Sequence, residues 1–260
     1  MKTHTRRCLS SLAALSLLLL TAGCSDESTS PDLITQEEAD DIATQVAASL
    51  ATDNGGTLAA LPLVMDEATS GTKAVETEEV TIGGITYRYS LMFFNAAGDT
   101  MVGGYDPLET TRLQMSLQAE GEIQTLRYQA RLGHRSLLQV HGVNALADTL
   151  VMNGDRSDTL SSDFTALMTE YQRHFRLESH AEIENMRYLK PVESGELPFD
   201  GLMTWQMTAS RFRDAEQTQL LAQITVMVTV RFDGGETAVI EVEGGWTYRI
   251  NLRTGAIERA

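Results

Sequence analysis

Apolar and polar residues alternate along most of the chain from Val80 onward, and this period of two constrains the fold more than any other feature. Successive side chains of a β-strand point to opposite faces, so an alternating run predicts a strand with one buried face. Such runs begin at or near Leu113, Leu126, Phe175, Met203, Ile224 and Trp246. Residues 80–260 are therefore predicted to form a mainly β body of about ten to twelve strands.

Short links that contain glycine separate the alternating runs: Gly83-Gly84, Asn153-Gly154, Asp233-Gly234-Gly235 and Thr254-Gly255. Links of this kind join antiparallel strands, because a parallel pair needs a crossover of about a dozen residues. The sequence thus predicts an antiparallel meander. Residues 153–158 carry oxygen ligands but lack the order of a calcium loop, and they are predicted to be a hairpin turn.

A sheet of this size must bury its apolar face in a sandwich, by curling into a barrel or half-barrel, or by accepting helices into its hollow. The alternation changes phase between Ile183 and Met186, which predicts a bulge that bends the strand. We therefore expect a strongly curved sheet with one or two short helices against its hollow. This layout is similar to that of the half-barrel carriers that move lipidated proteins or lipids across the bacterial envelope.

Two short helices are predicted. Thr35 followed by Glu38 has the spacing of a capping box. The apolar residues that follow recur three or four apart: Ala39, Ile42, Ala43, Val46, Ala47 and Leu50. A helix near 35–51 is therefore expected to dock on the body or cover an opening in it. A second helix is predicted over 163–171, and residues 57–79 are predicted to be a linker.

The N-terminus combines a basic start, an apolar run and small residues that end in cysteine: Lys2, Arg6, Arg7, Leu9–Leu20 and Thr21-Ala22-Gly23-Cys24. The apolar run is shorter than the about 20 residues needed to cross a bilayer. This arrangement resembles the signal of bacterial lipoproteins. The resemblance implies removal of residues 1–23 and lipidation of Cys24. An ordinary secretory signal cut near Ala22 and a plain membrane anchor are the alternatives.

The same resemblance implies a location in the cell envelope. Ser25 stands where an Asp would hold an enterobacterial lipoprotein at the inner membrane, so the outer membrane is expected, facing either the periplasm or the cell surface. The first partner is then the membrane, through the lipid. Cys8 leaves with the signal, so the mature chain has no second thiol for a disulfide.

The charge of the chain excludes some partners. Its net charge is −16, and removal of residues 1–23 takes away three basic and no acidic residues, which gives −19. Nucleic acid and anionic lipid surfaces need a positive footprint, so neither is expected as a partner. Residues 24–79 hold thirteen acidic residues and one basic residue, Lys73, and they are predicted to be an acidic tether for the body.

No catalytic, metal or cofactor site is predicted. The histidines after the signal have no metal-ligand spacing, since His174 and His180 would lie about 20 Å apart on one strand face. There is no Gly-x-Ser-x-Gly elbow. Carboxylate pairs two residues apart, such as Glu241 with Glu243, are expected to be polar surface rather than catalytic acids.

Large side chains on the apolar face of the strands are the remaining candidates: Tyr128, Met203, Trp205, Met207, Trp246 and Tyr248. They form either a close-packed core or the lining of a cavity for an acyl chain or another apolar ligand. Three functions follow. The first is an envelope lipoprotein whose noncatalytic β domain binds or scaffolds another component. The others are a carrier of an apolar ligand and an enzyme acting on glycans or esters.

Overall fold

The computed structural model describes residues 34–53, 55–59, 61, 77–124, 128–165, 172–189 and 199–260. The chain divides into two units, 1–33 and 34–260, and the second contains all of the described residues. The predicted signal segment and Cys24 lie outside the described residues.

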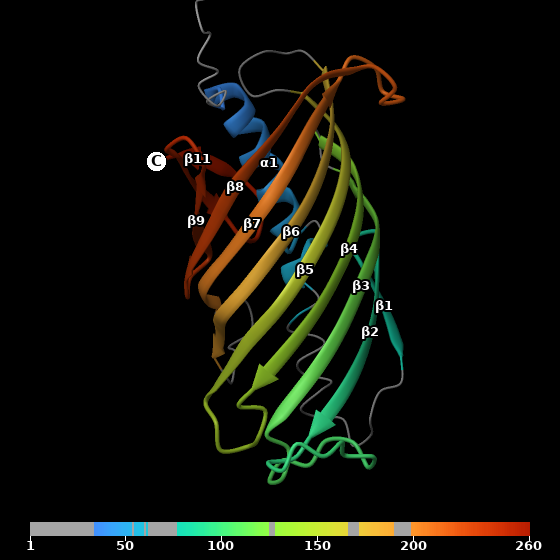
Figure 1. Cartoon of the computed structure of the whole chain (residues 1–260), viewed down its shortest axis with the longest axis vertical. Helices are drawn as coiled ribbons and strands as arrows, with labels where there is room; N and C mark the ends of the chain where they lie inside the picture. The colour runs from blue at the N-terminus through green and yellow to red at the C-terminus, as the bar shows by residue number, and fades with distance from the viewer. Residues whose placement is uncertain are drawn as a thin grey trace, which may run out of the picture. The chain divides into compact units, whose positions relative to one another are not determined.

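Within the described residues, eleven antiparallel strands form one open sheet in sequence order (Figure 1). The strands are β1 (Glu78–Ile82), β2 (Ile85–Phe94), β3 (Arg112–Gln124), β4 (Tyr128–His141), β5 (Thr149–Thr165), β6 (Gln172–Leu189), β7 (Phe199–Phe212), β8 (Leu220–Asp233), β9 (Thr237–Val242), β10 (Trp246–Asn251) and β11 (Ile257–Arg259). The predicted antiparallel meander is confirmed. Figure 1 shows the long strands curving around one helix, so the sheet is bent rather than folded into a sandwich.

Three of the four predicted hairpin links are confirmed. Gly83-Gly84 joins β1 to β2, where Ile82 pairs with Ile85. Asp233 ends β8, so that Gly234-Gly235 lies between β8 and β9, and Thr254-Gly255 lies between β10 and β11. Glycine is required at the first link because Gly83 and Gly84 have φ of 57° and 86°, values that side chains disfavour.

The prediction of a hairpin turn at residues 153–158 is wrong, because these residues lie inside β5. Asn153-Gly154 instead marks a bulge, where the register with β6 shifts between Met152 and Gly154. A Cβ on Gly154 would lie 2.1 Å from the carbonyl oxygen of Leu137, so the neighbouring strand leaves no room for a side chain. An isolated glycine in a strand often has this role.

The second bulge was correctly predicted from the change of phase after Ile183. The register between β6 and β7 shifts between Glu184 and Arg187, and Asn185 has a φ of 51°. This shift lets Met186 and Tyr188 return to the buried face of β6. The two bulges lie at one end of adjacent long strands, where they add local twist to the sheet.

The first helix, α1 (Gln36–Leu50), is present and carries the predicted capping box between Thr35 and Glu38. The prediction was that α1 rests on the body with one apolar face. Eleven of its fifteen residues are buried, so the protein surrounds the helix on more than one side. Figure 1 shows α1 within the curve of the sheet, and we call the sheet face toward it the inner face.

Two further predictions of local structure were wrong. Residues 57–59 and 61 are helical, and Leu58 and Leu61 are buried, so this part of the expected linker packs against the sheet. Asp163 does not begin a helix, because β5 continues to Thr165. The remainder of that expected helix, 166–171, lies outside the described residues.

The core is formed by the inner face of the sheet together with α1. Its largest fully buried side chains are Trp205, Tyr87, Tyr248, Phe93, Phe199 and Phe232. None of the helices in the described part of the chain is long and apolar enough to span a membrane.

Candidate functional site

The inner face carries a group of buried polar side chains, which we call the buried polar network. Its members are Thr57, His134 on β4, Arg156 and Asp158 on β5, and Ser179 on β6. His134 lies directly opposite Asp158 in the β4–β5 register. Arg156 and Asp158 are two residues apart, so both point to the same face of β5.

Asp158 is the centre of the network. Its Oδ1 atom lies 2.7 Å from His134 Nδ1. Its Oδ2 atom accepts a hydrogen bond of 2.6 Å from Arg156 Nε and a longer one of 3.4 Å from the Ser179 hydroxyl. Arg156 Nη1 donates to Thr57 Oγ1 at 2.8 Å, which connects the helical turn at 57–61 to the sheet.

The electrostatics of the network favour one protonation state. Burial alone would raise the pKa of Asp158, but the charge of Arg156 and the contact with His134 outweigh it and hold that pKa below its usual range. Burial lowers the pKa of His134, and Asp158 only partly opposes this. Asp158 is therefore ionised at neutral pH and His134 is neutral, with its Nδ1–H donating to Asp158.

One donor of the network is unsatisfied. Arg156 Nη2 is buried and, within the described residues, has no hydrogen-bond partner. The guanidinium carbon lies 5.5 Å from the ring centroid of Trp205, a distance at which a cation–π interaction offsets part of this cost. Among the described residues, Arg156 Nη2 is the one buried side-chain donor or acceptor left without a partner, which carries a desolvation cost.

A small cavity of about 20 Å³ adjoins the network. Thr57, Leu58 and Leu61 contribute to its lining, most of which is apolar: Leu58, Leu61, Leu117, Leu138, Ile183, Met186 and Met203, with the polar residues Thr57, His134, Ser136 and Arg156. This volume is close to the minimum that holds one water molecule and far below that of an acyl chain.

The network has two parts of a catalytic triad but not its connectivity. In a triad the histidine between the carboxylate and the nucleophile activates a hydroxyl. Here the Ser179 hydroxyl donates to Asp158 itself, and in the described part of the chain His134 is hydrogen-bonded to Asp158 alone. The arrangement holds Arg156 and the turn at 57–61 in place.

A second polar group fixes α1 inside the sheet, and we call it the helix clamp. It consists of Asp40 and Asp41 on α1, Arg173 on β6, Tyr248 on β10 and Arg259 on β11. Asp40 accepts from Tyr248 Oη at 2.9 Å and from Arg259 Nε at 3.0 Å. Asp41 accepts from Arg173 Nη1 at 2.6 Å, so α1 connects the middle of the sheet to its C-terminal edge.

Asp41 is the titratable member of the helix clamp. Burial raises its pKa to about 7, while the positive charge of Arg211 opposes the shift and the neighbouring Asp40 adds to it. The short contact with Arg173 also favours the ionised form, but burial has the larger effect. Asp41 therefore exchanges its proton near neutral pH.

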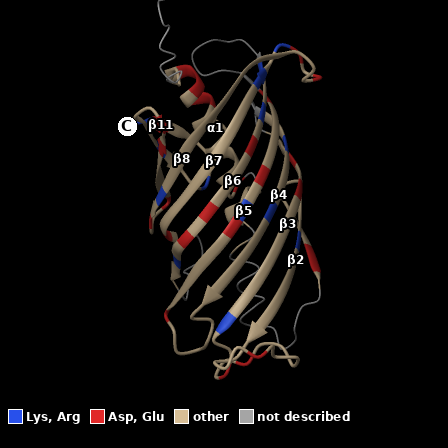
Figure 2. Cartoon of the chain, in the orientation of Figure 1, with Lys and Arg blue, Asp and Glu red and all other residues tan. Residues whose placement is uncertain are grey.

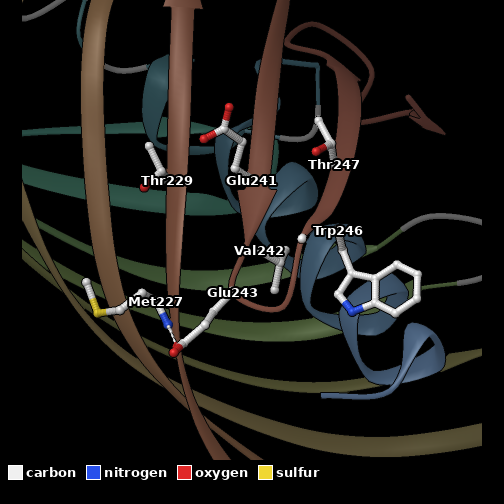
Figure 3. Close-up of a pocket in the computed structure, with 8 residues that line it drawn as sticks. Met227, Thr229, Glu241, Val242, Glu243, Trp246 and Thr247 are labelled. Atoms are coloured by element: carbon white, nitrogen blue, oxygen red, sulfur yellow. Dashed lines mark hydrogen bonds between the residues drawn. The ribbon is translucent and has the colours of Figure 1, made fainter. Parts of the chain in front are cut away.

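The third feature is a hollow of about 430 Å³ that is open to solvent, which we call the outer hollow (Figure 3). It is lined by Met227, Thr229, Glu241, Val242, Glu243, Gly245, Trp246 and Thr247, from β8, β9, β10 and the turn between the last two. The two carboxylates are exposed on the outer face, whereas the Trp246 indole shares the phase of the buried Tyr248 and Ile250 and points toward α1. Figure 3 shows Glu243 bonded to the main chain of Met227 and Trp246 beside α1.

Of the six predicted lining residues, the five whose side chains the structure describes do not meet at one place. Met203, Trp205 and Met207 are buried on β7, and Met203 lines the small cavity. Tyr248 is buried in the helix clamp, whereas Trp246 lines the outer hollow and donates from Nε1 to the Ile34 carbonyl at 3.3 Å. The side chain of Tyr128 lies outside the described part of the structure.

Sequence reasoning missed both polar groups of the inner face. Arg156 and Asp158 share the phase of the buried Leu160, which was the available signal, but the interpretation of 153–158 as a turn concealed it. Asp40 and Asp41 lie on the helix side that was expected to face solvent. Enclosure of a helix depends on contacts with distant strands, which local periodicity does not report.

Comparisons of this chain with models of protein families, with curated proteins and with solved structures found no match. In the described residues, no group of three His, Cys, Asp or Glu side chains is placed to hold a metal ion. Figure 2 shows acidic residues along the middle of the sheet, where Glu178, Glu182 and Glu184 are exposed on β6.

Proposed function

We propose that this protein is a lipoprotein of the bacterial cell envelope, anchored in the outer membrane through Cys24, whose β body binds or scaffolds another envelope component without catalysis. The proposed location is supported by the signal-like N-terminus. The role of the body rests on one observation, the enclosure of α1 within the curved sheet.

The enclosed helix supports a scaffold because it occupies the volume that a guest would need. Ile42, Ala43 and Val46 are each at most 1% exposed, and the helix clamp secures the polar side of α1. A core that is filled and pinned in this way gives a rigid body with a fixed outer surface. Rigid elements position a binding surface more accurately than loops do.

The anchor is tested by two cysteine substitutions in the full-length protein. Cys24→Ser should leave an unlipidated precursor, because the lipid acceptor is lost. Cys8→Ser should mature normally, since Cys8 leaves with the signal. Radiolabelled palmitate incorporation and gel mobility measure both, and equal maturation of the two variants would contradict the lipoprotein proposal.

The binding role is tested by chemical cross-linking in intact cell envelopes. A scaffold should give a discrete adduct of reproducible mass with the wild-type protein. The same adduct should be lost when the body is unfolded by substitution in the core, for example Val46→Asp. Absence of any adduct would argue against a binding partner.

A carrier of an apolar ligand is the second candidate, and the small cavity lined in part by the turn at 57–61 favours it. Most of the cavity's lining is apolar, as an apolar ligand requires, although at about 20 Å³ the cavity would have to enlarge to hold an acyl chain. A carrier should show saturable quenching of tryptophan emission by a fatty-acid analogue. Replacement of Trp205 and Trp246 by Phe should remove the quenching signal while calorimetry still reports binding, whereas a filled core should give no saturable signal.

A further inference from the structure

Strand β8 extends beyond the strand that covers its edge. It pairs with β7 from Leu220 to Asp233, but with β9 only from Val228 to Phe232. Coverage ends at Met227, where the Glu243 N–H donates to the Met227 carbonyl at 2.9 Å and the Met227 N–H donates to Glu243 Oε2 at 2.9 Å. Figure 3 shows this carboxylate contact.

The main-chain groups beyond Met227 continue the same alternation. Because Met227 directs its N–H and C=O away from β7, Gln223 and Thr225 do so as well. Within the described residues these groups have no main-chain partner on that side. The regular edge ends near Leu221, where the register shifts between Arg211 and Phe212. A stretch of about five residues is thus ready to pair with another strand.

The sequence of this edge contains none of the residues that usually protect a strand edge. Residues 220–227 read Leu-Leu-Ala-Gln-Ile-Thr-Val-Met and include no charged residue and no proline, although 22% of the chain is charged. Protective lysines and prolines are the common means of blocking an exposed strand edge, and neither is used here. Leu221 and Met227 are 48% and 42% exposed.

The surroundings of the edge determine what would fit it. The outer hollow begins at Met227 and presents the exposed carboxylates of Glu241 and Glu243. Glu241 has one surface ion pair of 3.8 Å with Arg231 and Glu243 accepts from the Met227 N–H, so both keep oxygen lone pairs that favour a cationic side chain. A second copy of the chain is disfavoured by its net charge of −16, and residues 25–33 of the same chain carry Asp26, Glu27 and Asp32.

We propose that the free edge of β8 binds an extended peptide segment of a partner protein by β-strand addition, with a Lys or Arg of that segment in the outer hollow. This inference rests on the proposed binding function and names its surface. Main-chain hydrogen bonds to Gln223 and Thr225 would supply affinity, and the carboxylates of Glu241 and Glu243 would supply specificity for a basic residue.

The test uses the full-length protein and synthetic peptides. The probe has two lysines followed by alternating valine and threonine, and a matched peptide has two glutamates instead. Both sequences are also made in reverse order, so that parallel and antiparallel pairing are sampled. Calorimetry should report saturable binding of a lysine peptide, at least about tenfold tighter than its glutamate counterpart.

Thr225→Pro and Thr225→Val form the matched pair of variants. Both remove the Thr225 hydroxyl, which lies 3.1 Å from that of Thr208, but only proline removes the N–H on the free edge. Thr225→Pro should weaken peptide binding by about threefold to tenfold relative to Thr225→Val. Peptides N-methylated on the amides that face β8 should also bind the wild-type protein more weakly. This measurement does not depend on whether Thr225→Pro folds.

The remaining outcomes separate this inference from the proposed function. Equal binding to Thr225→Pro and Thr225→Val, or no binding of any peptide, would overturn the edge as the site. Concentration-dependent dimers that vanish in Thr225→Pro would assign the edge to a second copy instead. A cross-linked envelope adduct that Thr225→Pro retains would leave the scaffold proposal standing while excluding this surface.

Discussion

Asp158 contacts three other members of the buried polar network, and the stability of the network depends on it for that reason. It neutralises Arg156, accepts from His134 and Ser179, and is almost fully buried. Buried ion pairs add little net stability when intact, but removal of one partner leaves an uncompensated charge. Arg156 already has one unsatisfied donor, and loss of the Asp158 carboxylate would also leave its positive charge unpaired.

Asp158→Asn should therefore lower the free energy of unfolding by about 3–5 kcal/mol. Ser179→Ala is the control, because its 3.4 Å hydrogen bond is long, and it should cost about 1 kcal/mol or less. Chemical denaturation measures both. In a double-mutant cycle, Arg156→Met should recover part of the loss in Asp158→Asn, and strictly additive effects would contradict the pairing.

Asp41 gives the stability of the fold a particular dependence on pH. Its folded-state pKa of about 7 lies above the unfolded value, so the folded state binds more protons between about pH 4 and pH 7. Its contribution to stability is therefore complete below about pH 4 and is lost as the pH rises through 7. His134 acts in the opposite sense, because its pKa is lowered and its contribution is lost as the pH falls below about 6.5.

Asp41→Asn should remove the first of these dependences. The difference in unfolding free energy between the wild type and Asp41→Asn should favour the wild type by about 2–3 kcal/mol more at pH 5 than at pH 8. Denaturation at the two pH values in one ionic strength measures this difference. His134→Gln is the comparison variant, and its difference from the wild type should change with pH in the opposite direction.

At the scale of the elements, the bulge at Gly154 in β5 positions the buried polar network. Gly154 has a φ of 152°, and an added Cβ would clash with the Leu137 carbonyl at 2.1 Å. The bulge there sets the register with β6 and so directs Arg156 and Asp158 inward. The position of the network thus depends on one glycine two residues away.

Gly154→Ala should destabilise the protein by about 2–4 kcal/mol, because strain in the backbone and a contact with a neighbouring strand add together. Gly103→Ala is the matched control, since a Cβ at Gly103 would meet nothing within 4 Å, and it should change stability by about 0.5 kcal/mol or less. Thermal unfolding measures both variants. Similar midpoints for the two would show that the bulge can relax.

The same strand shows how far sequence reasoning reaches. Alternation identified the strands, because the period of two is a local property that burial imposes on every strand, and the short links between them indicated the antiparallel order. It failed at Asn153-Gly154, where a bulge and a turn share the same residue chemistry and only the neighbouring strand distinguishes them. The burial of Leu58 and Leu61 was missed for a related reason, since a single helical turn carries too little periodicity to detect.

At the scale of the whole molecule, α1 connects parts of the sheet that do not pair with one another. Gln45 accepts from Ser162 on β5, Asp41 contacts Arg173 on β6, and Asp40 contacts β10 and β11. An open sheet has two ends that would otherwise move independently. The enclosed helix therefore makes the C-terminal strands and the middle of the sheet one cooperative unit.

This coupling predicts how local opening spreads. Arg259→Gln should weaken the contact between β11 and Asp40, leave the buried Asp40 carboxylate with Tyr248 as its remaining strand partner, and raise hydrogen exchange in α1 and in β10 together. Arg231→Gln is the matched control, because Arg231 forms a 3.8 Å ion pair with Glu241 at the surface and touches no part of the helix clamp. Exchange measured by mass spectrometry should rise about tenfold in α1 for Arg259→Gln, remain unchanged in β3 and β4, and stay at wild-type rates throughout for Arg231→Gln. Faster exchange confined to β11 would show instead that the strand frays alone and that α1 is held by its apolar contacts.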